Sequence, residues 1–487
     1  MGAWVILFMG LGLGYSMLTP IFENSDETLH YPYIKHLADG NGLPLAIPGQ
    51  PWNQEATQPP LYYAIVAAST FWIDTDNLPE HLQFNPHWLF TEVRSLINDN
   101  QNRVLHGPMD AFPFRRAALA IHMGRWWSLL FGAITVACSF IIYRQMFPQS
   151  LALANTATAL TALTPQFIRV SATVSNDSLS AALAALTVLV ALNFTQPQRQ
   201  ALAHGRRVAI KFNAGHALLL GLLAGLALLT KLSSLTTFLL VAFILFWRLL
   251  FLGALHRRPW HKLFGWLLLA GAMLLLLNGW YLWRNYQLYG EWLATETHLN
   301  LAGRGTLSIP QIWQLRAEIQ RAYWATFGWG QIRPPEWTFV LLRWFVSIGL
   351  LGLLLGIIAK LVQGHKNRPL PLNLAQINLE HIILLLFWAA LNLALYVRWV
   401  MEVGSVSHTR LIFPAITAIS LLLALGWHTL VPPRFAGWFG GGVATGLLAL
   451  NIYSLGWLIG PAFTPTNQQI SEPTSQRVDV TFLDSLT

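Results

Sequence analysis

The chain has 487 residues, of which 54% are hydrophobic and only 10% are charged. Soluble domains carry about 25% charged residues, so a water-soluble fold is excluded for most of the chain. The net charge of +9 is spread over short loops and helix ends, and we expect no nucleic-acid partner. The single cysteine, Cys138, lies in an apolar run and offers neither a disulfide nor a thiolate metal site.

Eleven apolar runs are long enough to cross a bilayer. A spanning helix needs about 20 predominantly apolar residues, and in the hydrocarbon core a helix satisfies its backbone polar groups internally. The sequence therefore predicts an all-α polytopic membrane protein with about eleven transmembrane helices. The runs lie at residues 2–19, 117–143, 151–170, 178–195, 214–231, 234–252, 263–283, 338–362, 381–399, 411–430 and 436–460.

The first run, 2–19, has two interpretations, a cleaved signal peptide or a retained helix. No basic residue precedes it, and Thr19-Pro20 is a poor cleavage site. We expect it to be retained as the first transmembrane helix.

The densest polar cluster follows this first run directly. If residues 25–37 are helical, Asp26 and His30 are four residues apart and share a helix face. One interpretation is a capped, solvated helix start with Ser25 as the cap. The other is a carboxylate that accepts a proton from an attacking hydroxyl or amine. The cluster reads Glu23-Asn24-Ser25-Asp26-Glu27-Thr28-Leu29-His30.

Two long loops are predicted on the side opposite the basic loops. The first, 20–116, contains an apolar stretch at 59–73 that begins with two prolines and is too short to span, so we expect an interfacial or re-entrant helix. The second covers 284–336. Loops of this length in compact proteins are usually functional. Residues 1–460 are therefore expected to form one transmembrane domain that includes both loops, followed by a polar tail at 461–487.

Basic residues predict the orientation, because cytoplasmic loops are enriched in Lys and Arg. We expect the side that carries them, and the amino terminus, to be cytoplasmic in a plasma (inner) membrane. Of the acidic residues, only Glu380 falls on that side, which indicates an exterior working surface. The basic residues are Arg199, Arg206, Arg207, Lys211, Arg248, Arg257, Arg258, Lys262, Lys360, Lys366 and Arg368.

Several charged residues interrupt or flank the apolar runs, and such groups indicate function unless they snorkel to the interface. For Arg169, snorkelling at a helix end remains an alternative. Asp177 is placed to cap a helix or to join the Asp26 site. Three further residues have two interpretations, binding of a phosphate head group or snorkelling to lipid phosphate: Lys231, His408 and Arg410.

Metal binding is a weaker hypothesis. Asp26, Glu27 and Asp177 carry suitable oxygen ligands, but their spacing is not diagnostic. A divalent ion is therefore a candidate cofactor, and His30 is expected to act as a hydrogen-bonding partner.

Short motifs follow one another along the chain in this order: Asp26-Glu27, Gln58-Pro59-Pro60-Leu61, Arg125-Trp126-Trp127-Ser128, Ser175-Asn176-Asp177, Leu229-Thr230-Lys231, Asn278-Gly279-Trp280, Arg284-Asn285 and Arg410-Leu411-Ile412-Phe413-Pro414. Taken together, they resemble the GT-C-type, multi-pass, lipid-dependent glycosyltransferases, which include protein O-mannosyltransferases and the aminoarabinose transferases of lipid A. Each motif is weak alone, and their shared order and spacing carry the resemblance. It runs from about residue 1 to 430 and is strongest to bacterial membrane proteins that carry DExxH and QPPLYY.

The resemblance implies a sugar donor on a polyprenyl phosphate and an inverting transfer on the non-cytoplasmic face. Asp26 would be the general base. Glu27, the second predicted catalytic residue, and His30 would orient the base or the acceptor. Arg125, Lys231 and Arg410 would be the fixed cations that stabilise the leaving phosphate. Gln58 stands where some relatives have a phosphate-binding lysine, which puts that contact in doubt. The predicted substrate-binding residues are His30, Gln58, Arg125, Asp177, Lys231, Arg284, His408 and Arg410.

Two other functions remain open from the sequence. A transporter or flippase of lipid-linked or polar solutes is disfavoured by the concentration of charge at the outer face and by the lack of paired broken helices. A non-catalytic subunit of a membrane complex is disfavoured by the retained Asp26-Glu27 pair. The acceptor, whether protein, lipid or glycan, is not predicted.

Overall fold

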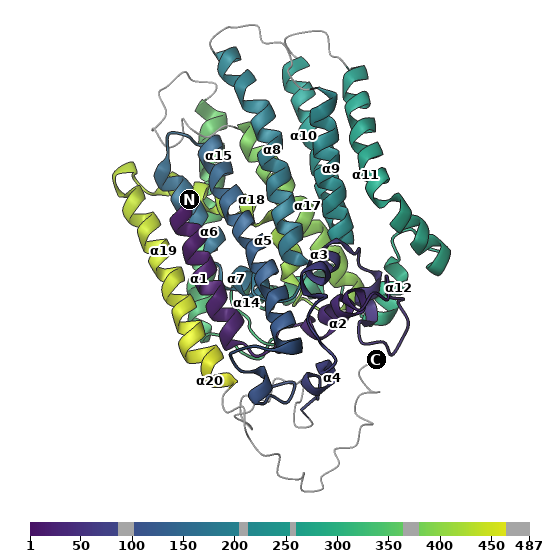
Figure 1. The fold of residues 1–487 in the computed structure, drawn as a ribbon. Helices are drawn as coiled ribbons and strands as arrows, with labels where there is room; N and C mark the ends of the chain where they lie inside the picture. The colour runs from purple at the N-terminus through teal and green to yellow at the C-terminus, as the bar shows by residue number, and fades with distance from the viewer. Residues whose placement is uncertain (86–101, 204–212, 254–259, 364–378, 464–487) are drawn as a thin grey trace.

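The computed structural model describes residues 1–85, 102–203, 213–253, 260–363 and 379–463, and within them every regular element is helical (Figure 1). The predicted all-α fold class is confirmed. Ten predicted runs correspond to α1 (Gly2–Leu18), α5 (Arg116–Met146), α8 (Asp177–Ala203), α9 (Ala214–Thr230), α10 (Leu235–Gly253), α11 (Trp260–Tyr289), α15 (Glu336–Gln363), α17 (Leu379–Val403), α18 (Ile416–Leu430) and α19 (Ala436–Tyr453).

The run at 151–170 is not one helix, which corrects the prediction. It forms α6 (Leu151–Ala162) and α7 (Pro165–Ser171). Thr164 between them is extended, with φ −67° and ψ 112°. Proline lacks a backbone N–H and disfavours the helical conformation at the preceding residue, so Pro165 begins a new helix.

Six helices among the described residues are long and apolar enough to cross a membrane, and the apolar helical stretches of the other predicted runs have 10–17 residues each. The helices of the two predicted outer loops gather at one end of the bundle, opposite the upper ends of α8 to α11 (Figure 1). They are α2 (Glu27–Ala38), α3 (Leu61–Thr70), α4 (Leu78–His81), α12 (Thr295–Ala302), α13 (Ile309–Gln314) and α14 (Arg316–Trp324). The loops at 204–212, 254–259 and 364–378 and most of the 461–487 tail lie outside the described residues, and the orientation stays a prediction.

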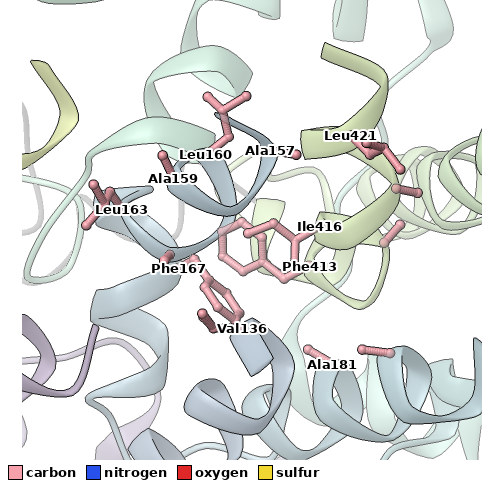
Figure 2. Close-up of a cluster of buried hydrophobic side chains, with 14 of the residues drawn as sticks. Val136, Ala157, Ala159, Leu160, Leu163, Phe167, Ala181, Phe413, Ile416 and Leu421 are labelled. Atoms are coloured by element: carbon pink, nitrogen blue, oxygen red, sulfur yellow. The ribbon is translucent and has the colours of Figure 1, made fainter. Parts of the chain in front are cut away.

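The hydrophobic core extends to the end of the bundle where these loop helices gather. Figure 2 shows Phe167 of α7 beside Phe413, which belongs to the 3₁₀ segment η5 (Thr409–Ala415) that precedes α18. The two rings meet edge to face, with centroids 5.4 Å apart and an interplanar angle of 74°. Arg169 follows Phe167 by two residues and Arg410 precedes Phe413 by three, so this aromatic contact holds two cationic segments side by side.

Helices α15 and α18 approach closely through glycines. A Cβ atom at Gly426 would lie 1.8 Å from the Gly349 carbonyl oxygen, and one at Gly352 would lie 2.2 Å from the Gly426 oxygen. Gly426→Ala is expected to force the helices apart and to cost roughly 1–3 kcal/mol, seen as a lower unfolding midpoint in detergent. The matched control is Gly441→Ala in α19, where nothing lies within 4 Å of the added Cβ. An equal effect of the two substitutions would contradict the packing argument.

Candidate active site

The turn after α1 places Asp26 at the end of the bundle where the helices of the two long loops gather. Phe22 and Asp26 have left-handed φ values of 67° and 64°, a region that non-glycine residues seldom occupy and that persists only where the surroundings hold it. The Asp26 backbone oxygen accepts hydrogen bonds from the Leu29 and His30 amides, both at 2.9 Å, while its side chain makes no cap bond. The prediction that Ser25 caps this helix is wrong, because its hydroxyl donates to the Gly328 oxygen at 3.2 Å.

A buried ion pair holds this turn in place. Arg125 Nε donates to Glu27 Oε1 at 2.7 Å and Nη2 donates to Oε2 at 2.6 Å, and both side chains are fully buried. The same carboxylate accepts hydrogen bonds from the amides of Phe22 at 2.8 Å and Val174 at 3.1 Å. Glu27 therefore connects the α1–α2 turn to the segment before α8.

Arg125 uses its remaining donors on the end of α1. Its Nη1 donates to the carbonyl oxygens of Ser16 and Thr19 at 2.7 Å, and its Nη2 donates to that of Pro20 at 2.8 Å. All five N–H groups of a guanidinium are thus engaged. The geometry favours a structural role for the pair, because the predicted phosphate contact of Arg125 and catalytic role of Glu27 would each require breaking these bonds.

Four predicted site residues come together in one charge network. The Asp26 carboxylate contacts Arg410, whose Nε lies 3.5 Å from Asp177 Oδ2. Asp177 Oδ1 lies 2.5 Å from Lys231 Nζ, and the Ser175 hydroxyl donates to Oδ2 at 2.9 Å. Asp26 and Asp177 therefore share one guanidinium although 151 residues separate them in the sequence.

A cavity of about 800 Å³ opens beside Asp26. Its walls come from the α1–α2 turn, α7, α14, the segment 326–334 and the segment 405–410, and they include Arg169, His408 and Arg410. Ligand pockets typically measure about 300–1,000 Å³, so this space suits a small-molecule or headgroup substrate next to the carboxylate.

The charge states in this cavity follow from burial and from Arg410. Burial alone would raise the pKa of the Asp26 carboxyl, but the Arg410 guanidinium outweighs it and holds that pKa well below its ordinary range. Burial lowers the pKa of His408, and Arg410 lowers it further. At neutral pH the cavity therefore presents an ionised carboxylate and a neutral imidazole.

The other predicted binding residues lie in neighbouring contacts. His30 Nδ1 lies 2.8 Å from the Tyr63 hydroxyl, which donates to Glu55 Oε2 at 3.1 Å, so the polar partner of His30 is this cluster and not Asp26. Gln58 follows the 3₁₀ helix η1 (Asn53–Thr57), and its buried Oε1 has no hydrogen-bond partner among the described residues. Arg284 donates to the carbonyl oxygens of residues 43 and 44, the latter at 2.8 Å.

A second buried network was not predicted. Glu23 accepts hydrogen bonds from the Arg103 amide at 2.7 and 2.8 Å and from the Val104 amide at 3.0 Å. His106 joins Glu23 to Asp110, with its ring nitrogens 3.0 and 2.9 Å from the two carboxylates. The acidic cluster 23–27 was a sequence signal for Glu23, but no local pattern pointed to the histidine 83 residues later.

This network predicts a pH-dependent stability. Burial alone would lower the pKa of His106, but the hydrogen bonds with Asp110 and Glu23 outweigh it and raise the pKa to about 9. Stabilisation by the charged imidazole is therefore complete below pH 6.5 and is lost as the pH rises through about 9. We expect the charged His106 imidazole to add roughly 2–3 kcal/mol to the free energy of unfolding. Unfolding midpoints of wild type and His106→Gln should differ at pH 6.5 and converge near pH 9.5; a constant difference would contradict the assignment.

The predicted metal ligands do not converge. Within the described parts of the chain, no three His, Cys, Asp or Glu side chains are grouped to hold a metal ion. Asp26, Glu27 and Asp177 instead contact Arg410, Arg125 and Lys231.

Comparisons with known proteins agree with the motifs. Residues 106–288, less than half of the chain, match the family profile of dolichyl-phosphate-mannose-protein mannosyltransferases. No curated protein gives a match. The match confirms the predicted resemblance to GT-C-type glycosyltransferases and supports the prediction of a glycosyltransferase; Asp26 lies outside the matched range.

Two solved structures align with most of this chain. The oligosaccharyltransferase of Archaeoglobus fulgidus in its apo form is 12% identical with a TM-score of 0.49, over 95% of this chain and 56% of that one. The chain thus spans little more than half the length of that protein. ArnT of Cupriavidus metallidurans bound to undecaprenyl phosphate is 13% identical with a TM-score of 0.46, over 95% of this chain and 74% of that one.

Proposed function

We propose that the chain is a membrane glycosyltransferase that moves a sugar from a polyprenyl-phosphate donor to an acceptor on the non-cytoplasmic face, with Asp26 as general base. The observation that carries this proposal is the ionised Asp26 carboxylate in the wall of the 800 Å³ cavity, in contact with Arg410. The mannosyltransferase family match supports a donor of this class.

The reaction needs a proton acceptor and a stabilised leaving group. Asp26 takes the proton of the acceptor hydroxyl as the oxygen of that hydroxyl forms a bond to the anomeric carbon of the sugar. The bond between the anomeric carbon and the phosphate oxygen breaks, and the phosphate leaves with the electron pair. Arg410 and Lys231 are the cations beside Asp26 and Asp177. Fixed positive charge where negative charge develops lowers the barrier of such a step.

Arg410 links donor binding to the strength of the base. While it contacts Asp26 it holds the pKa of that carboxyl low, and a carboxylate with a low pKa is a weak general base. A donor phosphate that draws Arg410 toward itself weakens this contact and raises the pKa of Asp26. The base is then strengthened only when the donor is in place.

The location of the site is part of the proposal. The helices of both long loops lie at the same end of the bundle as the cavity. The loops at the opposite end of the bundle are enriched in Lys and Arg, which supports a cytoplasmic position for that end. We place the protein in a plasma membrane.

The proposal is tested with purified protein in nanodiscs and radiolabelled polyprenyl-phosphate sugars. Release of polyprenyl phosphate together with transfer of label to an added acceptor mixture is expected. Movement of intact donor between the leaflets of reconstituted vesicles without its cleavage would instead establish a flippase. Neither cleavage nor binding of any donor would indicate a non-catalytic subunit.

A further inference from the structure

Arg169 is a buried cation that uses little of its hydrogen-bonding capacity. It lies on α7, is 5% exposed and lines the cavity beside Asp26. In the part of the chain that the structure describes, its one hydrogen bond runs from Nη1 to Asn24 Oδ1 at 3.4 Å, and its Nε has no partner. A guanidinium carries five N–H donors, so most of them are unused.

The nearby carboxylates are already paired. Glu27 contacts Arg125, Asp26 contacts Arg410, and Asp177 contacts Lys231. No described carboxylate forms an ion pair with Arg169, which makes it the excess positive charge of this region. A second unused donor lies beside it, because the buried Nδ2 of Asn24 also has no hydrogen-bond partner in the described parts of the chain.

From the sequence alone, Arg169 could have snorkelled to the lipid interface instead of serving a site. Its position in the structure does not fit snorkelling. Its helix is held by the contact between Phe167 and Phe413 (Figure 2), and its side chain faces the cavity beside Asp26. A buried charge without a counterion is destabilising, so a group of this kind is expected to serve a ligand.

We propose that Arg169 binds a phosphate-class anion inside the cavity, next to Asp26. This inference rests on the proposed glycosyl transfer and adds a substrate contact to it. Guanidinium groups bind phosphate with two parallel hydrogen bonds, and Arg169 has the free donors to do so. The phosphate comes from one of two sources, the lipid donor or an anionic group on the acceptor, whose hydroxyl would then lie close to the base.

The test compares wild type, Arg169→Met and Arg169→Gln by thermal unfolding in detergent. The probes are sodium phosphate, titrated at constant ionic strength against chloride, and a short-chain polyprenyl phosphate. Without a probe, at least one variant should unfold at or above the wild-type temperature, because the substitution removes an uncompensated charge. With a probe, both variants should show an apparent Kd at least ~10-fold higher than wild type.

The two sources give different results. A weaker affinity for polyprenyl phosphate assigns the site to the donor; a weaker affinity for inorganic phosphate alone assigns it to an acceptor anion. Arg316→Met is the matched control, because Arg316 is an exposed arginine on α14 that donates to the Trp313 oxygen, and it should bind both probes like wild type.

Three results would overturn the proposal: no stabilisation of wild type by either probe, unchanged affinities in the Arg169 variants, or destabilisation of both variants without a probe. Because the readout is binding, phosphate binding by a protein that transfers no sugar would refute the proposed function and leave the anion site standing.

Discussion

Asp26→Asn is expected to lower the rate of sugar transfer by roughly 10²–10⁴-fold, the usual contribution of a general base. Asparagine has nearly the same size and is well tolerated at positive φ, so the left-handed turn at φ 64° should persist. The amide cannot accept the proton of the attacking hydroxyl. The measurement is the initial rate of label transfer from polyprenyl-phosphate sugar, with donor affinity measured in parallel.

The matched control is Asp76→Asn, since Asp76 is an exposed carboxylate of the same loop whose ion-pair partner, Lys35, lies 3.7 Å away. It should transfer sugar at the wild-type rate. Equal rates for wild type and Asp26→Asn would refute the assignment of Asp26 as base. Loss of donor affinity without loss of rate at saturation would instead give Asp26 a role in binding.

Arg125→Met is expected to destabilise the protein by roughly 3–5 kcal/mol, because it leaves the Glu27 carboxylate buried without a counterion. It also removes the hydrogen bonds that connect Arg125 to the end of α1. The expected result is a sharply lower unfolding midpoint and a lower yield of folded protein, measured before any assay of transfer.

The double variant Glu27→Gln with Arg125→Met separates the two roles of this pair. Because it removes both charges, it should recover part of the lost stability. If Arg125→Met instead kept the wild-type midpoint while transfer was abolished, the sequence-based prediction of a substrate contact would be right and the structural role wrong.

The helices of this protein could be predicted from local sequence, since a run of about 20 apolar residues satisfies its backbone only as a helix. The failure at 151–170 also has a local cause. Pro165 carried the signal for a break, but apolar composition alone did not reveal it. Pro165 begins the separate helix α7, which brings Arg169 to the cavity.

The centre of the candidate site was partly predictable as well. Asp26 stood out as part of the densest polar cluster. Asp177, Lys231 and Arg410 stood out because charged groups are costly beside apolar helices. Their spacing in sequence did not say which carboxylate meets which cation. The predicted role of Arg125 depended on motif order, and its five hydrogen bonds became visible only when the end of α1 lay against α5.

The sequence by itself therefore determined the helical membrane class and singled out most of the charged residues that gather at the candidate site. The tertiary structure decided how those charges pair: Glu27 with Arg125 as a buried support, Asp26 with Arg410 at the cavity, and Arg169 with no carboxylate among the described residues. The physical reason is that the two properties depend on different lengths of chain. Burial follows from apolar composition along each segment, whereas ion pairing depends on ångström-scale distances between helices that are far apart in the chain.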